Sequence, residues 1–592
     1  MPDYNRRQFL SLMAAGTATP FLLTFSADKA LAGLSRAAYP DKAPLPLNRT
    51  NPSAVFDLSV ASGDPTASGV MLWTHIRSEQ YDPSESLTFQ VAVDPGFTLL
   101  ALEGKVRGEQ FGADRDHTVR LDLDGQLNAD SYYYYRFQYR GVFSRTGRCR
   151  TAAAVGQSVD SVKFALLTCQ DYTNGYYSAL NHVADDNSID YVAHLGDFIY
   201  ESVGDPRYQD LPFEDRRIEL PSGFPVAMNL EDYRFLHRTY RSDPFLQKAM
   251  ENHTWIITTD DHETCNDCYW DYEQDTLGCP DHPYTTDPQF SNDADLKRQL
   301  KLDSQRAWAE YIPARIDIDE GRTHPHLYSR IYRQFRFGDL VNLNMLDTRT
   351  YRTPHPCGED AFLGRYVPFG CGNLNNPEQS MMGETQREWL INTMAASTAR
   401  WNMLGNQTYM GRLGIDLGEK AKLPFNVDAW DGYDAERIWL MNEVQSNSIE
   451  NLVVVTGDLH TYMASQVKKN YADLNPFNFS NQVGVEFMTP SLTSAGLFDV
   501  LLAQAPDDEV RDFLLSATSE GAVRLTNPHI RMFNSKDHGY STIEYTDGYC
   551  EWIAYKVDKN LNSGEQERKA LARYRKYEAW PWMTQKSVQG YS

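Results

Sequence analysis

Residues 163–201 constrain the fold more than any other stretch, because they have the pattern of a strand, a helix and a second strand. Phe164–Thr168 and Tyr191–Leu195 are short apolar runs without helical spacing, which is typical of buried strands. Between them, Gly175–Ala184 carries apolar residues at helical spacing. A strand–helix–strand segment of this length predicts two parallel strands within an α/β fold.

Residues that can bind a metal ion follow both of these strands. Cys169 and Asp171 come after the first strand, and Asp197 and Tyr200 come after the second. Because the carboxyl ends of neighbouring parallel strands lie at one edge of a sheet, we expect these side chains to meet there. Asp197 follows a glycine at the end of a buried strand, so it is the natural carboxylate to bridge two metal ions.

Two later apolar runs, 255–259 and 452–456, repeat this arrangement. The tips that follow them add three candidate ligands and one candidate acid, namely Asp261, Asp458, His460 and His262. A single such tip could be an ordinary polar turn. Four tips in one chain, each with an aspartate beside a cysteine, histidine or tyrosine, predict a shared metal site.

The types of donor indicate which metals this site prefers. Thiolate and phenolate groups from Cys169 and Tyr200 suit a trivalent or soft metal such as iron, and His460 adds an imidazole. The carboxylates of Asp261 and Asp458 are hard oxygen donors, which suit calcium or magnesium better than zinc. Two metal ions held about 4 Å apart by a shared carboxylate suit in-line displacement at phosphorus.

The charge of the chain limits what it binds. Its 592 residues carry a formal net charge of −24, which argues against nucleic acids and anionic membranes as partners. A phosphate-bearing substrate would also be repelled, so it needs local cations. Arg349 and Arg352 follow an apolar run and could supply them, although salt bridges to nearby acids are the alternative. His262 could protonate a leaving oxygen, or it could be structural.

The N-terminus has the features of a twin-arginine export signal. Arg6 and Arg7 precede an apolar run over 12–25 that is too short for a stable membrane span, and 30–32 forms an Ala-x-Ala cleavage site. We therefore expect residues 1–32 to be removed, the Tat export machinery to be a partner, and the mature protein to be periplasmic or secreted. A frayed N-terminal helix is the alternative.

A chain of this length predicts two or more domains. Residues 33–52 are Pro-rich and irregular, which indicates a linker. Short alternating runs over 53–152 predict an all-β sandwich. Residues 161–592 contain the α/β pattern and the candidate site. Within them we expect 202–250 to be a long connection, and the helical spacing over 563–578 predicts a C-terminal helix.

Export would permit disulfides among the eight cysteines. Cys357 and Cys371 flank a Gly- and Pro-rich loop and could pair. Cys265, Cys268 and Cys279 lie in one strongly acidic loop that has neither strand nor helix period. Two of these three could pair, or the C-x-x-C could bind zinc, although the chain has no second C-x-x-C.

A series of motifs resembles the PhoD-like alkaline phosphatases, a family of the calcineurin-like metallophosphoesterases. In order, they are TCQDY, HLGDFIYE, DDHET, LDTRTYR, GETQREWL, WDGYDAER, GDLHTYM, FMTPSLTS and HGYS. The resemblance implies an α/β/β/α sandwich for 161–592, and an exported alkaline phosphatase that hydrolyses phosphate esters with a metal-bound hydroxide. Phosphodiester or phospholipase D-type hydrolysis is the first alternative, and an inactive metal-stabilised binding protein is the second.

The same resemblance implies a set of metal ligands. A ferric ion would be held by Cys169, Asp171, Asp197, Tyr200 and His460. A calcium ion would be held with the help of Asp197, Asp261 and Asp458. The chain departs from the wider superfamily in having Asn406 and Gln407 where a lone histidine is usual. This loss of nitrogen donors agrees with the preference for calcium that the carboxylates indicate.

Overall fold

The computed structural model describes residues 26–29, 51–206, 208–366, 371–374, 376–416, 422–475, 478–499, 512 and 516–590. The predicted export signal, 1–32, lies outside these residues except for β1 (Ser26–Lys29), which pairs with β5 (Leu100–Arg107). Most of the predicted linker, 33–52, also lies outside them. No helix among the described residues is long and apolar enough to cross a membrane.

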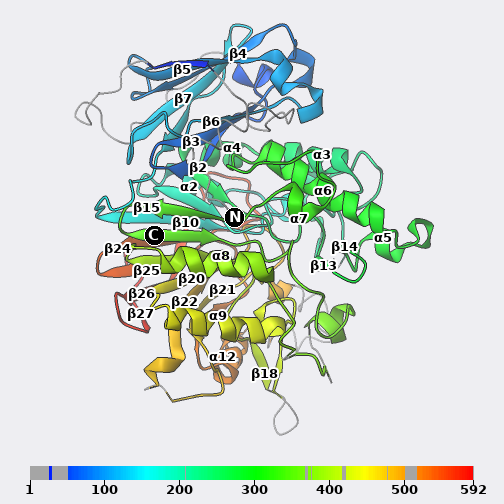
Figure 1. Cartoon of the computed structure of the whole chain (residues 1–592), viewed down its shortest axis with the longest axis vertical. Helices are drawn as coiled ribbons and strands as arrows, with labels where there is room; N and C mark the ends of the chain where they lie inside the picture. Colours follow the sequence, from blue (N-terminus) through cyan, green and yellow to red (C-terminus); the bar gives the residue numbers. More distant parts are fainter. Residues whose placement is uncertain are drawn as a thin grey trace, which may run out of the picture.

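Two β-sheets form the centre of the molecule (Figure 1). The first, in spatial order, contains β27 (Met583–Gln585), β26 (Lys569–Tyr577), β25 (Tyr549–Lys556), β24 (Gly539–Thr546), β10 (Ser161–Leu167), β11 (Tyr191–His194), β12 (Thr254–Ile257), β2 (Val60–Thr66), β3 (Gly69–His75) and β6 (Thr118–Asp122). The second contains β15 (Arg333–Phe337), β16 (Val341–Met345), β17 (Trp401–Gly405), β20 (Leu452–Thr456), β22 (Gln482–Met488), β21 (Tyr462–Lys468) and β23 (Ile530–Asn534).

The strand–helix–strand prediction is confirmed. β10 and β11 are parallel, with Phe164 opposite Tyr191, and β12 continues the parallel set. The connecting helix α2 (Ala179–Asp185) begins later than its apolar spacing predicts, and a 3₁₀ turn over Tyr172–Asn174 precedes it. In the second sheet β16, β17, β20 and β22 are also parallel. Each sheet therefore brings several carboxyl ends to one edge.

The two sheets pack face to face, with helices on both outer sides. Their shared core includes Phe164 and Leu166 from the first sheet and Leu343 and Val453 from the second. The outer face of the first sheet is covered by α2, α3 (Leu230–Arg241), α4 (Pro244–Asn252) and α6 (Ala294–Tyr311). The outer face of the second sheet is covered by α8 (Gly383–Ala395) and α9 (Asp434–Ser446). This is the expected α/β/β/α sandwich.

Helices α3 and α4 correct the expectation that 202–250 is only a long connection. In α3, Tyr233, Leu236 and Tyr240 recur at helical spacing and are fully buried. The side chains of Asn229 and Asp243 cap the two helices by accepting backbone N–H bonds. These caps were readable signals among the Pro and acidic residues of the segment.

The N-terminal strands share a sheet with the α/β part of the chain. β4 (Ser86–Ala92), β5 and β7 (Tyr132–Tyr139) form a smaller sheet, which packs on β2, β3 and β6 around one core. β2 also pairs in parallel with β12, with Gly63 opposite Trp255, so the first sheet runs on into the α/β part (Figure 1, blue to green). A Cβ at Gly63 would lie 2.8 Å from the Trp255 carbonyl oxygen, so only glycine fits this junction.

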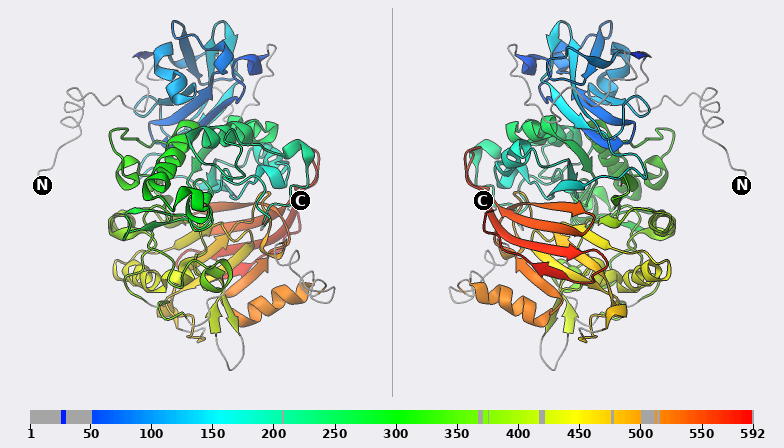
Figure 2. Two further views of the ribbon diagram at one scale, coloured as in Figure 1. Left: turned by 90° about the vertical axis from the view of Figure 1, so that its right-hand side faces the viewer. Right: turned by 90° about the vertical axis from the view of Figure 1, so that its left-hand side faces the viewer.

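The predicted C-terminal helix over 563–578 is wrong. Lys569–Tyr577 is strand β26, which pairs antiparallel with β25 and β27 at the side of the molecule seen in Figure 2. Ala570, Ala572 and Tyr574 alternate toward the interior, and this period of two prevailed over the helix-forming Leu571 and Arg573 between them. The expected pair Cys357–Cys371 is confirmed as a disulfide.

Candidate metal centre

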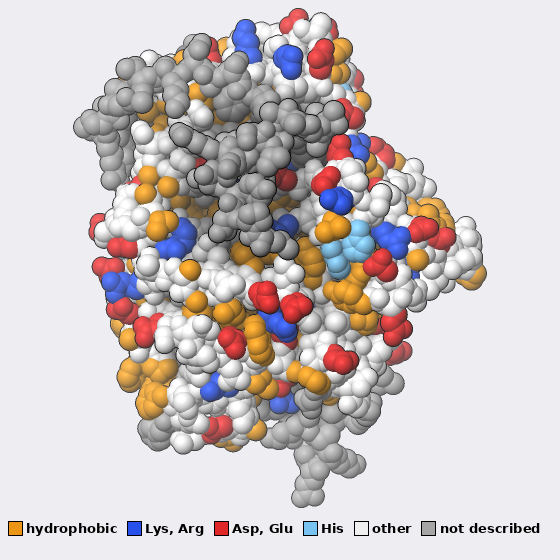
Figure 3. All heavy atoms as spheres, viewed as in Figure 1, with side chains coloured by type: hydrophobic (Ala, Val, Ile, Leu, Met, Phe, Trp, Pro, Cys, Tyr) orange, Lys and Arg blue, Asp and Glu red, His pale blue; other side chains and the backbone are white. Residues whose placement is uncertain are grey.

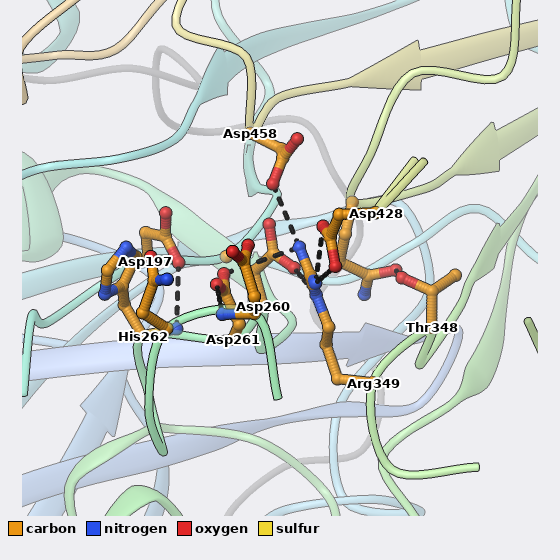
Figure 4. Close-up of polar contacts among 12 residues, drawn as sticks. Asp197, Asp260, Asp261, His262, Thr348, Arg349, Asp428 and Asp458 are labelled. Atoms are coloured by element: carbon orange, nitrogen blue, oxygen red, sulfur yellow. Dashed lines mark hydrogen bonds and ion pairs between the residues drawn. The ribbon is translucent and has the colours of Figure 1, made fainter. Parts of the chain in front are cut away.

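The tips of four strands, three in the first sheet and one in the second, bring the predicted ligands together. Potential ligand atoms lie within 4.8 Å of one another in three groups: Cys169, Asp197 and His460; Asp197, Asp261 and His262; and Asp260, Asp261 and Asp458. The groups overlap at Asp197 and Asp261, so they form one continuous site. In Figure 4, Asp197 lies beside His262, whereas Asp260 and Asp458 point toward Arg349. Asp458 and His460 are its partly exposed members, and the others are buried.

The backbone at this site is unusual. Four candidate ligands have positive φ angles: Cys169 (53°), Asp197 (55°), Asp458 (65°) and His460 (55°). Non-glycine residues rarely adopt this region, and such conformations concentrate at functional sites, where the surrounding structure offsets their cost. Gly196 is also in it (φ 112°), and a Cβ there would lie 2.5 Å from the Asp260 Cβ. The strand tips are therefore packed as closely as the backbone allows.

Cys169, Asp197, Tyr200 and His460 form what we call the soft-donor cluster. The Tyr200 hydroxyl lies 3.1 Å from Asp197 Oδ2 and 3.2 Å from His460 Nε2. His460 Nδ1 lies 2.5 Å from the carbonyl oxygen of Ala495, to which it donates its proton. The Nε2 lone pair therefore faces the cluster, in the tautomer that suits a metal ligand.

Asp260, Asp261, Asp428 and Asp458 surround Arg349 and form what we call the carboxylate cluster (Figure 4). The Arg349 guanidinium contacts Asp260 at 2.5 Å, Asp428 at 2.8 Å, Asp458 at 2.9 Å and Asp261 at 3.5 Å. All four contacts use side-chain oxygens, and Arg349 is fully buried. Of the two predicted arginines, the structure thus brings Arg349 into the site.

Arg352 lies one layer further out. It donates to Asp428 Oδ1 at 2.5 Å, and it also donates to the Asp428 carbonyl oxygen and to the sulfur of Met381. His355 Nε2 lies 2.8 Å from the same Asp428 carboxylate. The Asp428 carboxylate therefore contacts three cationic side chains, those of Arg349, Arg352 and His355. Both arginines therefore form salt bridges with nearby acids, which was the alternative that the sequence left open.

The pKa values of the buried acidic groups indicate whether the site suits a cation. Burial, followed by the negative charge of Asp197, raises the pKa of the Cys169 thiol well above its usual range. Burial also raises the pKa of Asp260 to about 7, and that of Asp458 well above normal. Asp260 Oδ2 is buried without a hydrogen-bond partner in the described part of the chain. These groups fit a bound cation, which would replace their protons.

His262 lies between the two clusters and is paired with a carboxylate. Its Nδ1 is 2.7 Å from Glu201 Oε2, and its ring lies against Tyr200 with centroids 4.1 Å apart. Burial would lower the pKa of His262, but the charges of Glu201, Asp261 and Asp197 outweigh it and raise the pKa well above its usual value. His262 is therefore held as a charged proton donor.

The structure does not bring Asp171 into this set. Its Oδ1 accepts hydrogen bonds from the backbone and hydroxyl of Thr173, and its Oδ2 accepts one from Gln209. These contacts cap the short 3₁₀ turn after Cys169, and no Asp171 oxygen is in the three ligand groups. Its place in the sequence, two residues from Cys169, says nothing about this capping role.

Sequence reasoning missed several residues of the site. Glu263 accepts hydrogen bonds from the backbone N–H groups of Asp197, Phe198 and Asp260, and so ties two strand tips together. Glu201 orients His262, and Asp260 supplies a third carboxylate. All three lie in the motifs HLGDFIYE and DDHET, in which only neighbouring residues were predicted to belong to the site. Asp428 had no such signal, because it is on a distant loop that only the fold brings here.

Comparison with known proteins gives one family over most of the chain. Residues 164–552 match the family described as PhoD-like phosphatase, and residues 41–153 match the N-terminal domain of that family. Alkaline phosphatase D of Bacillus subtilis (strain 168) is 31% identical over 486 residues, which cover 81% of this chain and 74% of that protein. The solved structure of PhoD superposes with a TM-score of 0.72 at 27% identity, covering 92% of this chain and 95% of that one.

Proposed function

The chain belongs to the PhoD-like phosphatase family and is a phosphoric ester hydrolase, and on that premise we propose that it is an exported alkaline phosphatase with an iron–calcium centre. One observation carries the proposal. A cluster with sulfur, phenol and imidazole donors lies directly beside a cluster with only carboxylates, and Asp197 and Asp261 connect them. Two chemically different halves suit two different metal ions.

The donors of each half support one metal. Cys169, Tyr200, Asp197 and His460 would hold Fe³⁺, because thiolate and phenolate are anionic, polarisable ligands. Asp261 and Asp458, with Asp197, would help to hold Ca²⁺, and Asp260 adds a further oxygen donor to that side. When bound, the metal pair supplies the positive charge that favours attack at phosphorus.

Residues of the chain supply the proton for the leaving group and part of the positive charge near the phosphate. Glu201 fixes Nδ1 of His262, so that Nε2 carries the proton available to a leaving alkoxide. Arg349 offsets the charge of four aspartates, which reduces the repulsion that a phosphate would meet. Asp458 and His460 line the open side of the site, where a phosphate ester would enter.

Small phosphate esters are the proposed substrates. The net charge of −24 disfavours nucleic acids, and on the face in Figure 3 the Lys and Arg side chains lie singly among Asp and Glu. Hydrolysis of p-nitrophenyl phosphate and of bis(p-nitrophenyl) phosphate, with and without calcium, tests the reaction. Faster turnover of the monoester is expected. Preference for the diester would favour the phosphodiesterase alternative, and failure on both would favour an inactive binding protein.

The metals can be tested separately from the reaction. Fe³⁺ bound to a thiolate and a phenolate absorbs visible light, which neither calcium nor zinc does. A calcium chelator should remove activity reversibly and leave the colour, whereas Tyr200→Phe and Cys169→Ser should bleach or shift it. A colourless, fully active enzyme that contains zinc would contradict the iron–calcium centre and leave the phosphatase assignment standing.

Export rests on the sequence of the first 32 residues. Arg6 and Arg7 precede the apolar run, so replacing both with lysine should leave the protein in the cytoplasm. The mature protein should begin near Gly33. Normal arrival of the double variant in the periplasm would refute the Tat route.

A further inference from the structure

Three cysteines gather directly behind the carboxylate cluster. Cys265, Cys268 and Cys279 are buried thiols, and none belongs to the three ligand groups of the metal centre. The stretch that carries them forms a small hairpin, β13 (Tyr269–Asp271) and β14 (Thr276–Gly278), where the sequence showed no period.

The hairpin brings the three sulfur atoms into one place. Tyr269 is opposite Gly278, so Cys268 and Cys279 stand opposite each other one step beyond the paired residues. The N–H of Cys268 donates to the carbonyl oxygen of Cys265 at 3.2 Å, which turns Cys265 back over the end of the hairpin. Burial, followed by contact with the thiols of Cys268 and Cys279, raises the pKa of the Cys265 thiol well above its usual range, and contact with Cys265 lowers the pKa of Cys268.

This geometry is compatible with more than one disulfide. Facing residues of an antiparallel pair have Cα atoms about 4.5–5.5 Å apart, within the range that disulfides span. Cys265 is in contact with both other thiols, so it can pair with either, and the third thiol remains available to exchange.

Cys265 also borders a cavity, although its side chain is almost fully buried. It lines a cavity of about 190 Å³ together with Asn266, Asp281, Tyr208 and Glu201. Cys268 and Cys279 do not line this cavity, so attack on an external disulfide would begin at Cys265.

The cysteines are connected to the catalytic residues through the backbone. The N–H groups of Thr264 and Cys265 donate to the carbonyl oxygen of Asp261 at 2.7 and 2.8 Å. The N–H of Asn266 donates to Glu201 at 2.7 Å, and that of Asp267 donates to the Asp261 carboxylate at 2.6 Å. A bond that ties Cys265 to the hairpin would therefore tighten the segment that holds both carboxylates.

We propose that Cys265, Cys268 and Cys279 form a thiol–disulfide exchange site that fastens the β13–β14 hairpin to the turn after Asp261. Cys265 passes its proton to the Cys268 thiolate and attacks a low-molecular-weight disulfide, such as oxidised glutathione, which releases one external thiol. The Cys279 thiolate then attacks the Cys265 sulfur and releases the second. Two protein thiols lose two protons and two electrons, and the external disulfide is reduced to two thiols. Cys268 stays reduced and can reopen the bond by attacking Cys265.

Thiol counting tests the proposal without any variant. The wild-type protein is incubated with oxidised or reduced glutathione, unfolded in iodoacetamide and digested with a protease that cleaves after glutamate. Cleavage after Glu273 separates Cys279 from the other two, so a Cys265–Cys279 bond joins two peptides. The oxidised sample should contain that joined pair, and the reduced sample should show three alkylated thiols.

Variants sharpen the assignment. Cys279→Ser should divert the bond to Cys265–Cys268, within one peptide, and Cys265→Ser should prevent both bonds. Cys149→Ser is the matched control, because Cys149 is a buried thiol in the N-terminal core. It should leave the reaction unchanged.

Two results would overturn the proposal. One is three free thiols after prolonged oxidation, with Cys357–Cys371 intact. The other is a zinc ion found by native mass spectrometry that Cys265→Ser removes.

Discussion

The soft-donor cluster and the carboxylate cluster are neighbours, yet they balance their charge in different ways. In the described part of the chain, Cys169, Asp197, Tyr200 and His460 form no ion pair with Lys or Arg, and the charged side chain beside them is that of His262, which lies against Tyr200. The carboxylate cluster instead encloses Arg349, and Asp428 adds Arg352 and His355. The soft-donor cluster therefore contains no arginine or lysine, whereas the carboxylate cluster is built around Arg349.

This difference shows what each half needs from a metal ion. Burial raises the pKa of Cys169 and Asp197, so the soft-donor cluster can be fully ionised only when an external cation occupies it. Arg349 lowers the pKa of Asp261 despite its burial, so that carboxylate is ionised without a metal. Burial raises the pKa of Asp260 and Asp458 in the same cluster, so binding of a metal ion should release protons from both halves.

The largest effect is expected for Asp197→Asn, because Asp197 is the member that connects the halves. The charge of a metal pair contributes several kcal/mol to the transition state, so activity should fall by about 10³-fold or more. Metal analysis should show that both metals are depleted. Asp171→Asn is the matched control, since Thr173 and Gln209 engage its oxygens, and it should keep its iron. Equal loss of iron in both variants would contradict this placement.

His262→Ala comes next, because His262 serves the reaction from between the halves. Loss of a general acid should lower kcat by about 10²–10⁴-fold for phenyl phosphate, and by less for p-nitrophenyl phosphate, whose leaving group needs less protonation. Glu201→Gln should reproduce part of the effect, because it removes the charge that keeps His262 protonated. An equal loss for both substrates would indicate a structural role.

Arg349→Ala and Arg352→Ala should separate the inner cation of the carboxylate cluster from the outer one. Removing one partner of a buried ion pair costs about 3–5 kcal/mol, so both variants should lower the melting temperature. Only Arg349→Ala should also raise KM or lower kcat for phosphate esters, because Arg349 alone contacts Asp458 and Asp261. Unchanged activity of both single variants and of the double variant would exclude them from the site.

His355 gives the smallest effect and a dependence on pH. Burial opposes its charge, but Asp428 and Glu359 raise the pKa of His355 to about 9. Since the ordinary value is about 6.5, its stabilisation is complete below that pH and is lost as the pH rises through 9; its size is on the order of 3 kcal/mol. Melting temperatures of the wild type and His355→Gln should therefore differ at pH 6 and converge near pH 10. A constant difference would contradict the charged state.

Local patterns were sufficient for much of the fold and site. The apolar runs predicted β10, β11, β12 and β20 to within a few residues, because a buried strand has a short-range signature. The residues after each run then predicted most of the site. The prediction of a helix over 563–578 failed because its Ala, Lys and Arg favour helices, whereas pairing with β25 and β27 decided the outcome.

By itself, the sequence determined which chemical groups stand at the strand tips, since each lies next to a buried run along the chain. Only the tertiary structure decided how these groups are divided. In the folded chain, Asp171 accepts hydrogen bonds from Thr173 and Gln209. Arg349 lies among four aspartates, and Asp428, from a distant loop, forms an ion pair with Arg352. The reason is that charges interact over distances in space, and a chain folded into two facing sheets brings together residues whose separation in sequence predicts no contact.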